Sequence, residues 1–121
     1  MYYKNLEAWK EAIILVKQIY IKTKQFPQEE LYGLTSQIKR AVISIPSNIA
    51  EGMSRYSDND KSRFIDIAIG SLAEVETQLI ISKELGFVED IDEELQSINK
   101  IKALVIGLKK YLNKEKGELI T

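Results

Sequence analysis

Cysteine and histidine are both absent from the 121 residues of this chain. Without cysteine there is neither a disulfide framework nor thiol chemistry. Without histidine the chain lacks the usual general base near neutral pH and the commonest protein ligand of metal ions. These absences exclude Ser–His and Cys–His nucleophilic sites and zinc sites. We therefore expect no catalytic residues, no cofactor and no metal, which leaves carboxylates, lysine or tyrosine as the only groups for an enzyme.

Long apolar runs are missing as well. No apolar stretch approaches the ~18 residues that a membrane-spanning helix needs, and residues 1–7 show no signal-peptide pattern. We therefore expect a cytoplasmic protein with no membrane partner. The hydrophobic fraction of 45% and the charged fraction of 29% are those of an ordinary globular protein. The length predicts one domain over residues 1–121, large enough to bury a sizeable core.

Proline is scarce, and both prolines are informative. The Phe26-Pro27 step ends a helix, because the residue before proline is pushed out of helical geometry. Pro46 instead lies within a segment whose apolar residues recur at helical spacing. Proline inside a helix removes one backbone hydrogen bond and collides with the preceding turn, which costs about 3 kcal/mol. We expect a helix over residues 28–53 that is bent at Pro46.

Apolar residues recur every three or four positions along most of the chain, which is the helical period. Together with the turn residues, this spacing predicts four helices, at about residues 6–24, 28–53, 58–85 and 90–114. Because the loops between them are short, neighbouring helices run in opposite directions. The predicted fold class is all-α, an antiparallel up-down-up-down four-helix bundle.

Several residues predict how these helices begin and end. Asn5 is expected to cap the first helix. Asp90, with Glu93 three residues later, resembles a capping box for the fourth helix. Gly52 and Gly86 are expected to end the second and third helices in the left-handed conformation.

The first helix has more apolar residues than a single core face needs. The face that we expect to be buried consists of Leu6, Trp9, Ile13, Val16, Tyr20 and Thr23. Leu15 and Ile19 lie outside it, and the third and fourth helices carry similar extra apolar residues. Because a bundle core needs a stripe only ~100° wide, this surplus favours an oligomer. The alternative is a squat bundle that buries broader faces.

Polar residues interrupt the predicted inner faces of the second and third helices. They are Gln37, Arg40, Ser44, Asn48, Glu51, Glu74 and Gln78. In an antiparallel pair Arg40 and Glu74 lie at the same level, which predicts a buried or half-buried ion pair. We interpret the group as a structural polar network that fixes the helix register. The alternative is an active site in which Arg40 acts with the carboxylates of Glu51 and Glu74.

Charge is unevenly distributed along the predicted bundle. The net charge of −1 is not that of a dedicated nucleic-acid binder. Basic residues nevertheless gather at the end that holds the N-terminus, the loop between the second and third helices, and the end of the fourth helix. They are Lys4, Arg55, Lys61, Arg63, Lys109, Lys110, Lys114 and Lys116. This pole predicts an RNA or DNA contact through phosphates, and the alternative is simple complementarity to the helix dipoles.

Several segments resemble one known family in order along the chain. The most specific is Ser-Ile-Pro-Ser-Asn-Ile-Ala-Glu-Gly at residues 44–52, and the others are residues 3–10, 31–38, 70–79 and 85–87. On these motifs the chain resembles the four-helix bundle family of 23S rRNA intervening-sequence proteins. The resemblance covers nearly the whole chain.

That resemblance implies an antiparallel four-helix bundle that assembles as a ring-shaped homopentamer. It also implies relatives encoded within insertions in bacterial 23S rRNA genes, and similarity to the accessory proteins of diversity-generating retroelements. Those accessory proteins are basic and bind nucleic acid and a reverse transcriptase, whereas the net charge of this chain is −1. The family offers no catalytic residues to carry over.

Two hypotheses about function remain beside the enzyme. The first is a non-enzymatic homo-oligomer that contacts RNA or DNA through its basic pole. The second is an oligomeric scaffold that binds another protein and no nucleic acid.

Overall fold

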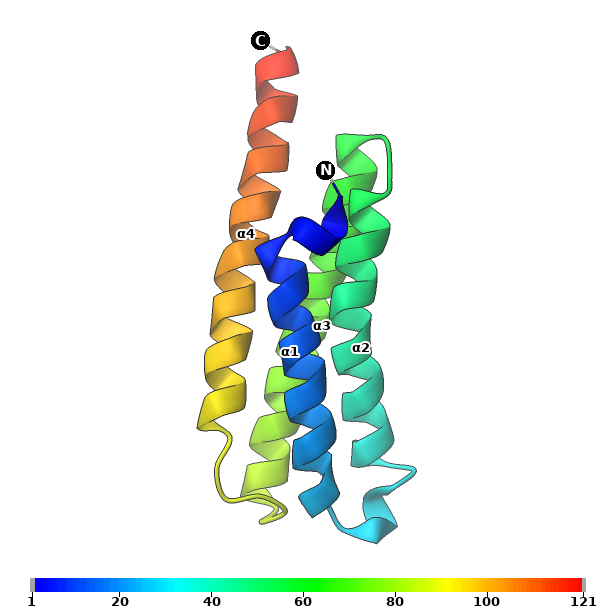
Figure 1. Cartoon of the computed structure of the whole chain (residues 1–121), viewed down its shortest axis with the longest axis vertical. Helices are drawn as coiled ribbons and strands as arrows, with labels where there is room; N and C mark the ends of the chain where they lie inside the picture. Colours follow the sequence, from blue (N-terminus) through cyan, green and yellow to red (C-terminus); the bar gives the residue numbers. More distant parts are fainter. Residues whose placement is uncertain (1, 121) are drawn as a thin grey trace.

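The computed structural model describes the backbone of residues 2–120 and the side chains of residues 2–113. It contains four α-helices, α1 (Glu7–Lys22), α2 (Leu34–Met53), α3 (Asp58–Glu84) and α4 (Asp92–Ile120) (Figure 1). Three single-turn 3₁₀ helices accompany them, at Tyr3–Asn5, Thr23–Gln25 and Gln28–Glu30. No strand occurs in the part of the chain that the structure describes. The all-α four-helix fold class is confirmed.

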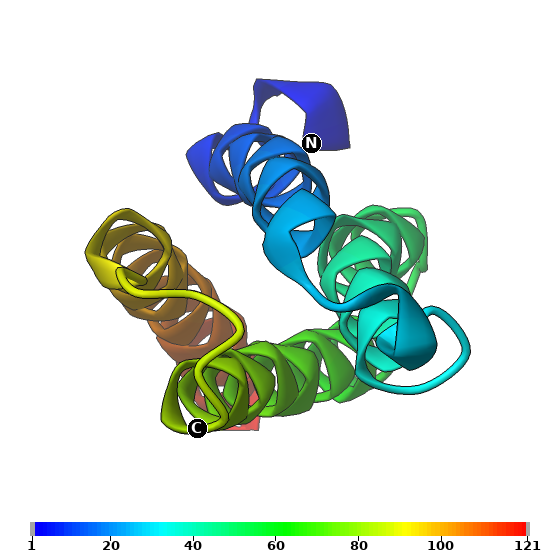
Figure 2. The same ribbon diagram turned by 90° about the horizontal axis from the view of Figure 1, so that it is seen from below.

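The four helices are arranged around a common core. In Figure 1 the chain runs down α1, up α2, down α3 and up α4. Each helix packs mainly against two neighbours, so that α1 and α3 both contact α2 and α4 (Figure 2). As a result α1 and α3 occupy diagonally opposite positions. Pro46 lies inside α2, and the bend that we expect there stays a prediction.

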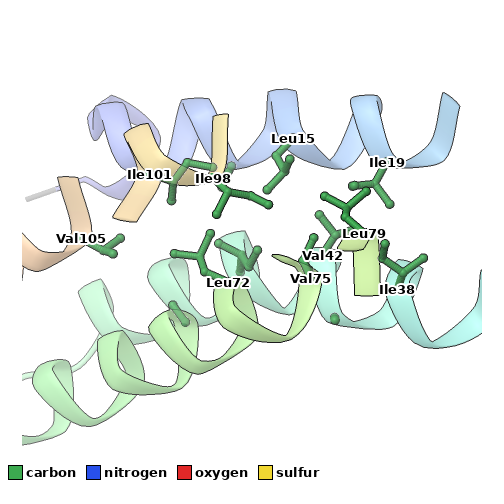
Figure 3. Close-up of a cluster of buried hydrophobic side chains, with 14 of the residues drawn as sticks. Leu15, Ile19, Ile38, Val42, Leu72, Val75, Leu79, Ile98, Ile101 and Val105 are labelled. Carbon is green, nitrogen blue, oxygen red and sulfur yellow. The ribbon is translucent and has the colours of Figure 1, made fainter. Parts of the chain in front are cut away.

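One apolar stripe from each helix fills the centre of the bundle (Figure 3). The labelled side chains come from all four helices and are almost completely buried. They are Leu15, Ile19, Ile38, Val42, Leu72, Val75, Leu79, Ile98, Ile101 and Val105. Burial of large aliphatic side chains such as these contributes most of the stability of a fold of this size.

The predicted core face of α1 is only partly correct. Leu6, Trp9 and Val16 are partly buried and pack against the core, but the centre of the buried stripe lies elsewhere. Leu15 and Ile19 are 0% exposed, whereas Ile13 and Tyr20 on the predicted face are 37% and 39% exposed. Both faces satisfy the helical period, so spacing alone cannot choose between them. The buried stripe also contains two alanines, at positions 8 and 12, and small side chains let α1 approach its neighbours closely.

Helix α2 begins later than predicted. It starts at Leu34, since residues 28–30 form a 3₁₀ turn instead of its first turn. Gly33 adopts a non-helical conformation before it, and the Glu30 carboxylate accepts a hydrogen bond from the Leu34 N–H at 3.1 Å. Leu31, which precedes the helix, is exposed.

Two other helix starts also differ from prediction. Asn5 lies in a 3₁₀ turn, and Leu6 occupies the cap position of α1 without a side-chain hydrogen bond. Helix α4 starts at Asp92, because Asp90 accepts a hydrogen bond from the Asp92 N–H at 2.8 Å and so holds a turn ahead of the helix. At its other end α4 continues past the predicted Lys114 to Ile120.

The end of α3 follows the prediction for Gly86. This glycine has φ +78°, which side chains disfavour in other residues. The Phe87 N–H donates to the Ser82 carbonyl at 2.9 Å and the Gly86 N–H donates to the Lys83 carbonyl at 3.0 Å. These two hydrogen bonds form a Schellman motif, which satisfies carbonyl groups at the helix end.

Gly52 has a different role from the predicted left-handed cap. Among the residues described, Gly86 alone has a positive φ, and Gly52 is a buried residue within α2. A Cβ atom on Gly52 would lie 2.9 Å from the Phe64 Cβ and 3.2 Å from the Lys61 carbonyl oxygen. Glycine is therefore required here because α2 and α3 approach each other closely beside their connecting loop.

We predict that Gly52→Ala lowers the free energy of unfolding by about 1–3 kcal/mol, because the new methyl group overlaps α3. Gly107→Ala is the matched control, since a Cβ there meets nothing within 4 Å. It should raise the stability by about 0.5–1 kcal/mol. Urea denaturation measures both. Equal effects of the two substitutions would contradict the close α2–α3 contact.

Candidate functional site

A polar groove with a volume of about 490 Å³ lies between α2 and α3. Five of the seven residues of the predicted polar network line it, together with residues from the turn before α2 and from α3. The lining residues are Tyr32, Ser36, Gln37, Arg40, Ala41, Ser44, Ser71, Glu74 and Gln78. The two helices therefore bring these five polar residues to one groove.

One side-chain hydrogen bond joins α2 to α3 in this groove, and two more lie beside it within α2. The hydroxyl groups of Ser44 and Ser71 are 2.7 Å apart and share a hydrogen bond. The Asn48 amide donates to the Ser44 carbonyl at 2.8 Å and to its hydroxyl at 2.9 Å. Sequence reasoning missed Ser71, although a small polar residue at the level of Ser44 on the facing helix was a usable signal.

The predicted ion pair between Arg40 and Glu74 is wrong. Both side chains are exposed, and no described residue forms an ion pair or hydrogen bond with either side chain. Arg40 lies two residues before the buried Val42, and Glu74 lies two residues after the buried Leu72. Two helical residues correspond to a rotation of roughly 200°, so both side chains point away from the core.

The other members of the predicted network divide between burial and exposure. Gln78 is only 7% exposed, and its Oε1 atom has no hydrogen-bond partner. Gln37 is exposed. Glu51 lies outside the groove. Its carboxylate accepts a hydrogen bond from Arg55, which lies one helical turn later in the chain. The active-site alternative therefore loses its geometry, because Glu51 does not share the groove with Arg40.

The basic residues lie on segments that share one end of the bundle, namely the N-terminal turn, the α2–α3 connection and the adjoining part of α4 (Figure 1). Two of them are neutralised locally. Arg55 pairs with Glu51, and the Lys109 ammonium lies 2.6 Å from the Asp66 carboxylate. Positive charge at this end is therefore weaker than the sequence indicated.

The remaining basic residues keep their charge available. No ion pair within the described side chains involves Lys4, Lys61, Arg63 or Lys110. The Lys4 ammonium lies 5.7 Å from the centre of the Tyr2 ring. The other two predicted contacts, Lys114 and Lys116, lie outside the described side chains.

Two aromatic residues at this end were not predicted. Tyr56, in the α2–α3 connection, is fully exposed. The guanidinium groups of Arg55 and Arg63 each lie 4.9 Å from the centre of the Phe64 ring, within the range of cation–π attraction. In the sequence, Tyr56 directly follows Arg55 and Phe64 directly follows Arg63, and this pairing of aromatic and basic residues could have predicted them.

A second groove, between α1 and α2, is apolar and has a volume of about 320 Å³. Its lining residues are Tyr3, Trp9, Ile13, Val16, Ile43, Pro46, Ser47 and Ala50. Three residues of the predicted α1 core face line it, of which Trp9 and Val16 also pack against the core and Ile13 is exposed. We call this feature the α1–α2 groove.

A buried carboxylate lies between α1 and α4. Glu94 is 3% exposed, and its Oε2 atom lies 3.7 Å from the Lys22 ammonium, while Oε1 has no partner. Burial raises the pKa of this carboxyl, and the nearby Glu93 and Asp90 raise it further, against a hydrogen bond to its own backbone N–H and the charge of Lys22. Proton binding by Glu94 is thus favoured by folding.

These features define an all-helical bundle protein with two surface grooves, one polar and one apolar, flanking α2. The family model described as 23S rRNA-intervening sequence protein matches residues 4–114. The chain belongs to this family, and the resemblance seen in its motifs is confirmed. A comparison with curated proteins gives no match.

Two negative observations concern the residues that the structure describes. No group of three or more acidic residues there could hold a metal ion. Over the same residues, no helix combines the length and the apolar character that crossing a bilayer requires.

Arg40→Met is predicted to change the free energy of unfolding by less than about 0.5 kcal/mol, because the guanidinium is exposed and unpaired. Urea denaturation of the two proteins tests this. Asn48→Ala serves for comparison and should destabilise by about 1 kcal/mol, since it removes two part-buried hydrogen bonds to Ser44 within α2. If Arg40→Met lowered the free energy of unfolding by more than about 2 kcal/mol, the result would support the ion pair between Arg40 and Glu74.

We also predict a pH dependence from Glu94. Because its pKa is raised in the folded protein, its contribution to stability is full below the ordinary value of 4.5. It is lost as the pH rises through the raised pKa. Glu94→Gln removes this titration, so the free energy of unfolding of the variant minus that of the wild type should increase between pH 4.5 and 7. Urea denaturation across this range measures it, and a constant difference would contradict the assignment.

Proposed function

We propose that the chain functions as a non-enzymatic homo-oligomer that contacts RNA through the basic end of the bundle. The resemblance to the family implies a homopentamer, and the name of the family connects its members with 23S rRNA. We further propose that the protein acts in the cytoplasm and works by binding. The absence of histidine and cysteine and the separation of Glu51 from Arg40 support binding over catalysis.

The observation that carries the proposed assembly is the α1–α2 groove. Ile13 and Ile43 are exposed there, beside the partly buried Trp9, and an apolar surface patch can mark an interface with another chain. Covering such a patch stabilises an assembly by about 25 cal/mol per Å² of apolar surface. The groove is open to solvent along the side of the bundle, where a second chain can reach it.

The RNA contact is supported by the basic end. Lys4, Lys61, Arg63 and Lys110 have no carboxylate partner, and each can neutralise one phosphate. Tyr56 extends fully into solvent beside them, and an exposed aromatic ring can stack on an unpaired base. In an assembly whose bundles are aligned, the positive charges of these ends would lie on one side and act together on one RNA. The alternative is an oligomeric scaffold with no nucleic acid, in which the basic residues complement the helix dipoles.

Assembly is tested by measuring the mass in solution at micromolar concentrations. We expect the wild type to be larger than a monomer, and Ile43→Glu to reduce the mass because it places a charge in the α1–α2 groove. Ile14→Glu is the matched control, since Ile14 is equally exposed but outside the groove. A wild-type monomer would contradict the proposed function.

The RNA contact is tested by titrating the assembled protein with a structured RNA at two salt concentrations. We expect binding that weakens with salt, and a logarithmic salt slope that falls by about 1 for Lys110→Glu. Lys83→Glu, at the opposite end of α3, should leave the slope unchanged. Binding that is absent or independent of salt would favour the scaffold.

A further inference from the structure

Helices α1 and α3 occupy diagonally opposite positions in the bundle (Figure 2), and each carries a stripe of exposed residues. Side chains in each follow at steps of three and four residues, the spacing of one helix face. The α1 stripe, on α1 and the turn after it, consists of Lys10, Ile13, Lys17, Tyr20 and Lys24, all exposed. The α3 stripe consists of Ile67, Gly70, Glu74, Thr77, Ile81 and Glu84, also all exposed.

The two stripes carry opposite charges. The α1 stripe has three lysines and no acidic residue, whereas the α3 stripe has two glutamates and no basic residue. None of these five charged side chains forms an ion pair within the part of the chain whose side chains are described. Each is therefore available to a partner outside its own chain.

The charges also lie at matching heights along the bundle. Lys100 of α4 pairs with Glu11 at 2.9 Å, and Lys102, two residues later, pairs with Glu76 at 3.9 Å. Because both lysines lie on the same turn of α4, Glu11 and Glu76 are at nearly the same level. Helices α1 and α3 run in the same direction in Figure 1.

This common level sets the register between the two stripes. Lys10, next to Glu11, is within one turn of the level of Glu74. Lys17, seven residues later, is within one turn of the level of Glu84. Two copies placed side by side with parallel axes would therefore bring lysines of the α1 stripe opposite glutamates of the α3 stripe.

The uncharged residues of the stripes are also compatible. Ile13 forms one wall of the α1–α2 groove, while Ile67 and Ile81 expose apolar surface on α3. Between them lies Gly70, where an added Cβ would meet nothing within 4 Å. The α3 stripe thus has open space in front of a small residue, where another helix can approach closely.

We propose that the α3 stripe of one copy packs against the α1 stripe and the α1–α2 groove of the next copy. This inference rests on the proposed homo-oligomer and names its contact surfaces. Two α1 stripes would repel each other through their lysines, which disfavours a symmetric pairing of like surfaces. Each copy has one α1 stripe and one α3 stripe, and the two bind different neighbours. The assembly therefore closes as a ring or continues as a chain. Parallel axes place the basic ends of all copies on one side.

The test reverses the charges of each stripe and then of both. Lys10→Glu with Lys17→Glu makes both stripes acidic, and Glu74→Lys with Glu84→Lys makes both basic. Either pair should raise the protein concentration needed for half-assembly at least about tenfold, because like charges then face each other. The fourfold variant exchanges the two signs and should return the mass in solution to the wild-type value.

The control pair Lys110→Glu with Glu89→Lys lies outside both stripes and should leave the mass unchanged. Far-UV circular dichroism establishes that each variant is folded, as expected for exposed positions. If the double variants keep the wild-type mass, or if the fourfold variant fails to reassemble while folded, these contact surfaces are wrong. That outcome differs from a wild-type monomer, which would overturn the proposed homo-oligomer itself.

Discussion

Helix α1 carries more apolar surface than the core of the bundle buries, since Ile13 and Tyr20 stay exposed while Leu15 and Ile19 are fully buried. Leu15 and Ile19 fill the core, with alanines on the same stripe that permit close packing. A second face, which includes Trp9 and Ile13, then remains beside α2 and forms the α1–α2 groove. Everything proposed about assembly depends on this division. Without it Ile13 would not line an apolar groove beside α2.

Helix α2 lies between the two grooves, and the signature at residues 44–52 distributes its side chains to both sides. Ser44 forms a hydrogen bond to α3, while Pro46 lines the α1–α2 groove. Gly52 allows the closest approach of α2 to α3. The signature thus combines polar contacts, apolar surface and a small residue in one helix. These requirements explain its residues without any catalytic role.

The sequence was sufficient for the fold class, because four long segments share the helical period and Gly86 is an unambiguous stop. The sequence was insufficient to predict which face of α1 is turned toward the core, since Leu15 and Ile13 lie on different faces that both satisfy the helical period. It also failed for the ion pair between Arg40 and Glu74, because level along a helix does not establish direction around it. The turn at residues 28–33 is held by one hydrogen bond that the Glu30 carboxylate accepts from the Leu34 N–H, and a periodic pattern of apolar residues does not predict such a bond.

The central claim is that assembly covers the second face of α1. Trp9 is the only tryptophan of the chain and lines that face, so it reports directly on the groove. The decisive measurement is acrylamide quenching of its fluorescence at protein concentrations on both sides of the dissociation midpoint. The account predicts weak quenching in the assembled protein and stronger quenching after dilution to the monomer. Quenching that stays constant while the mass falls would contradict it.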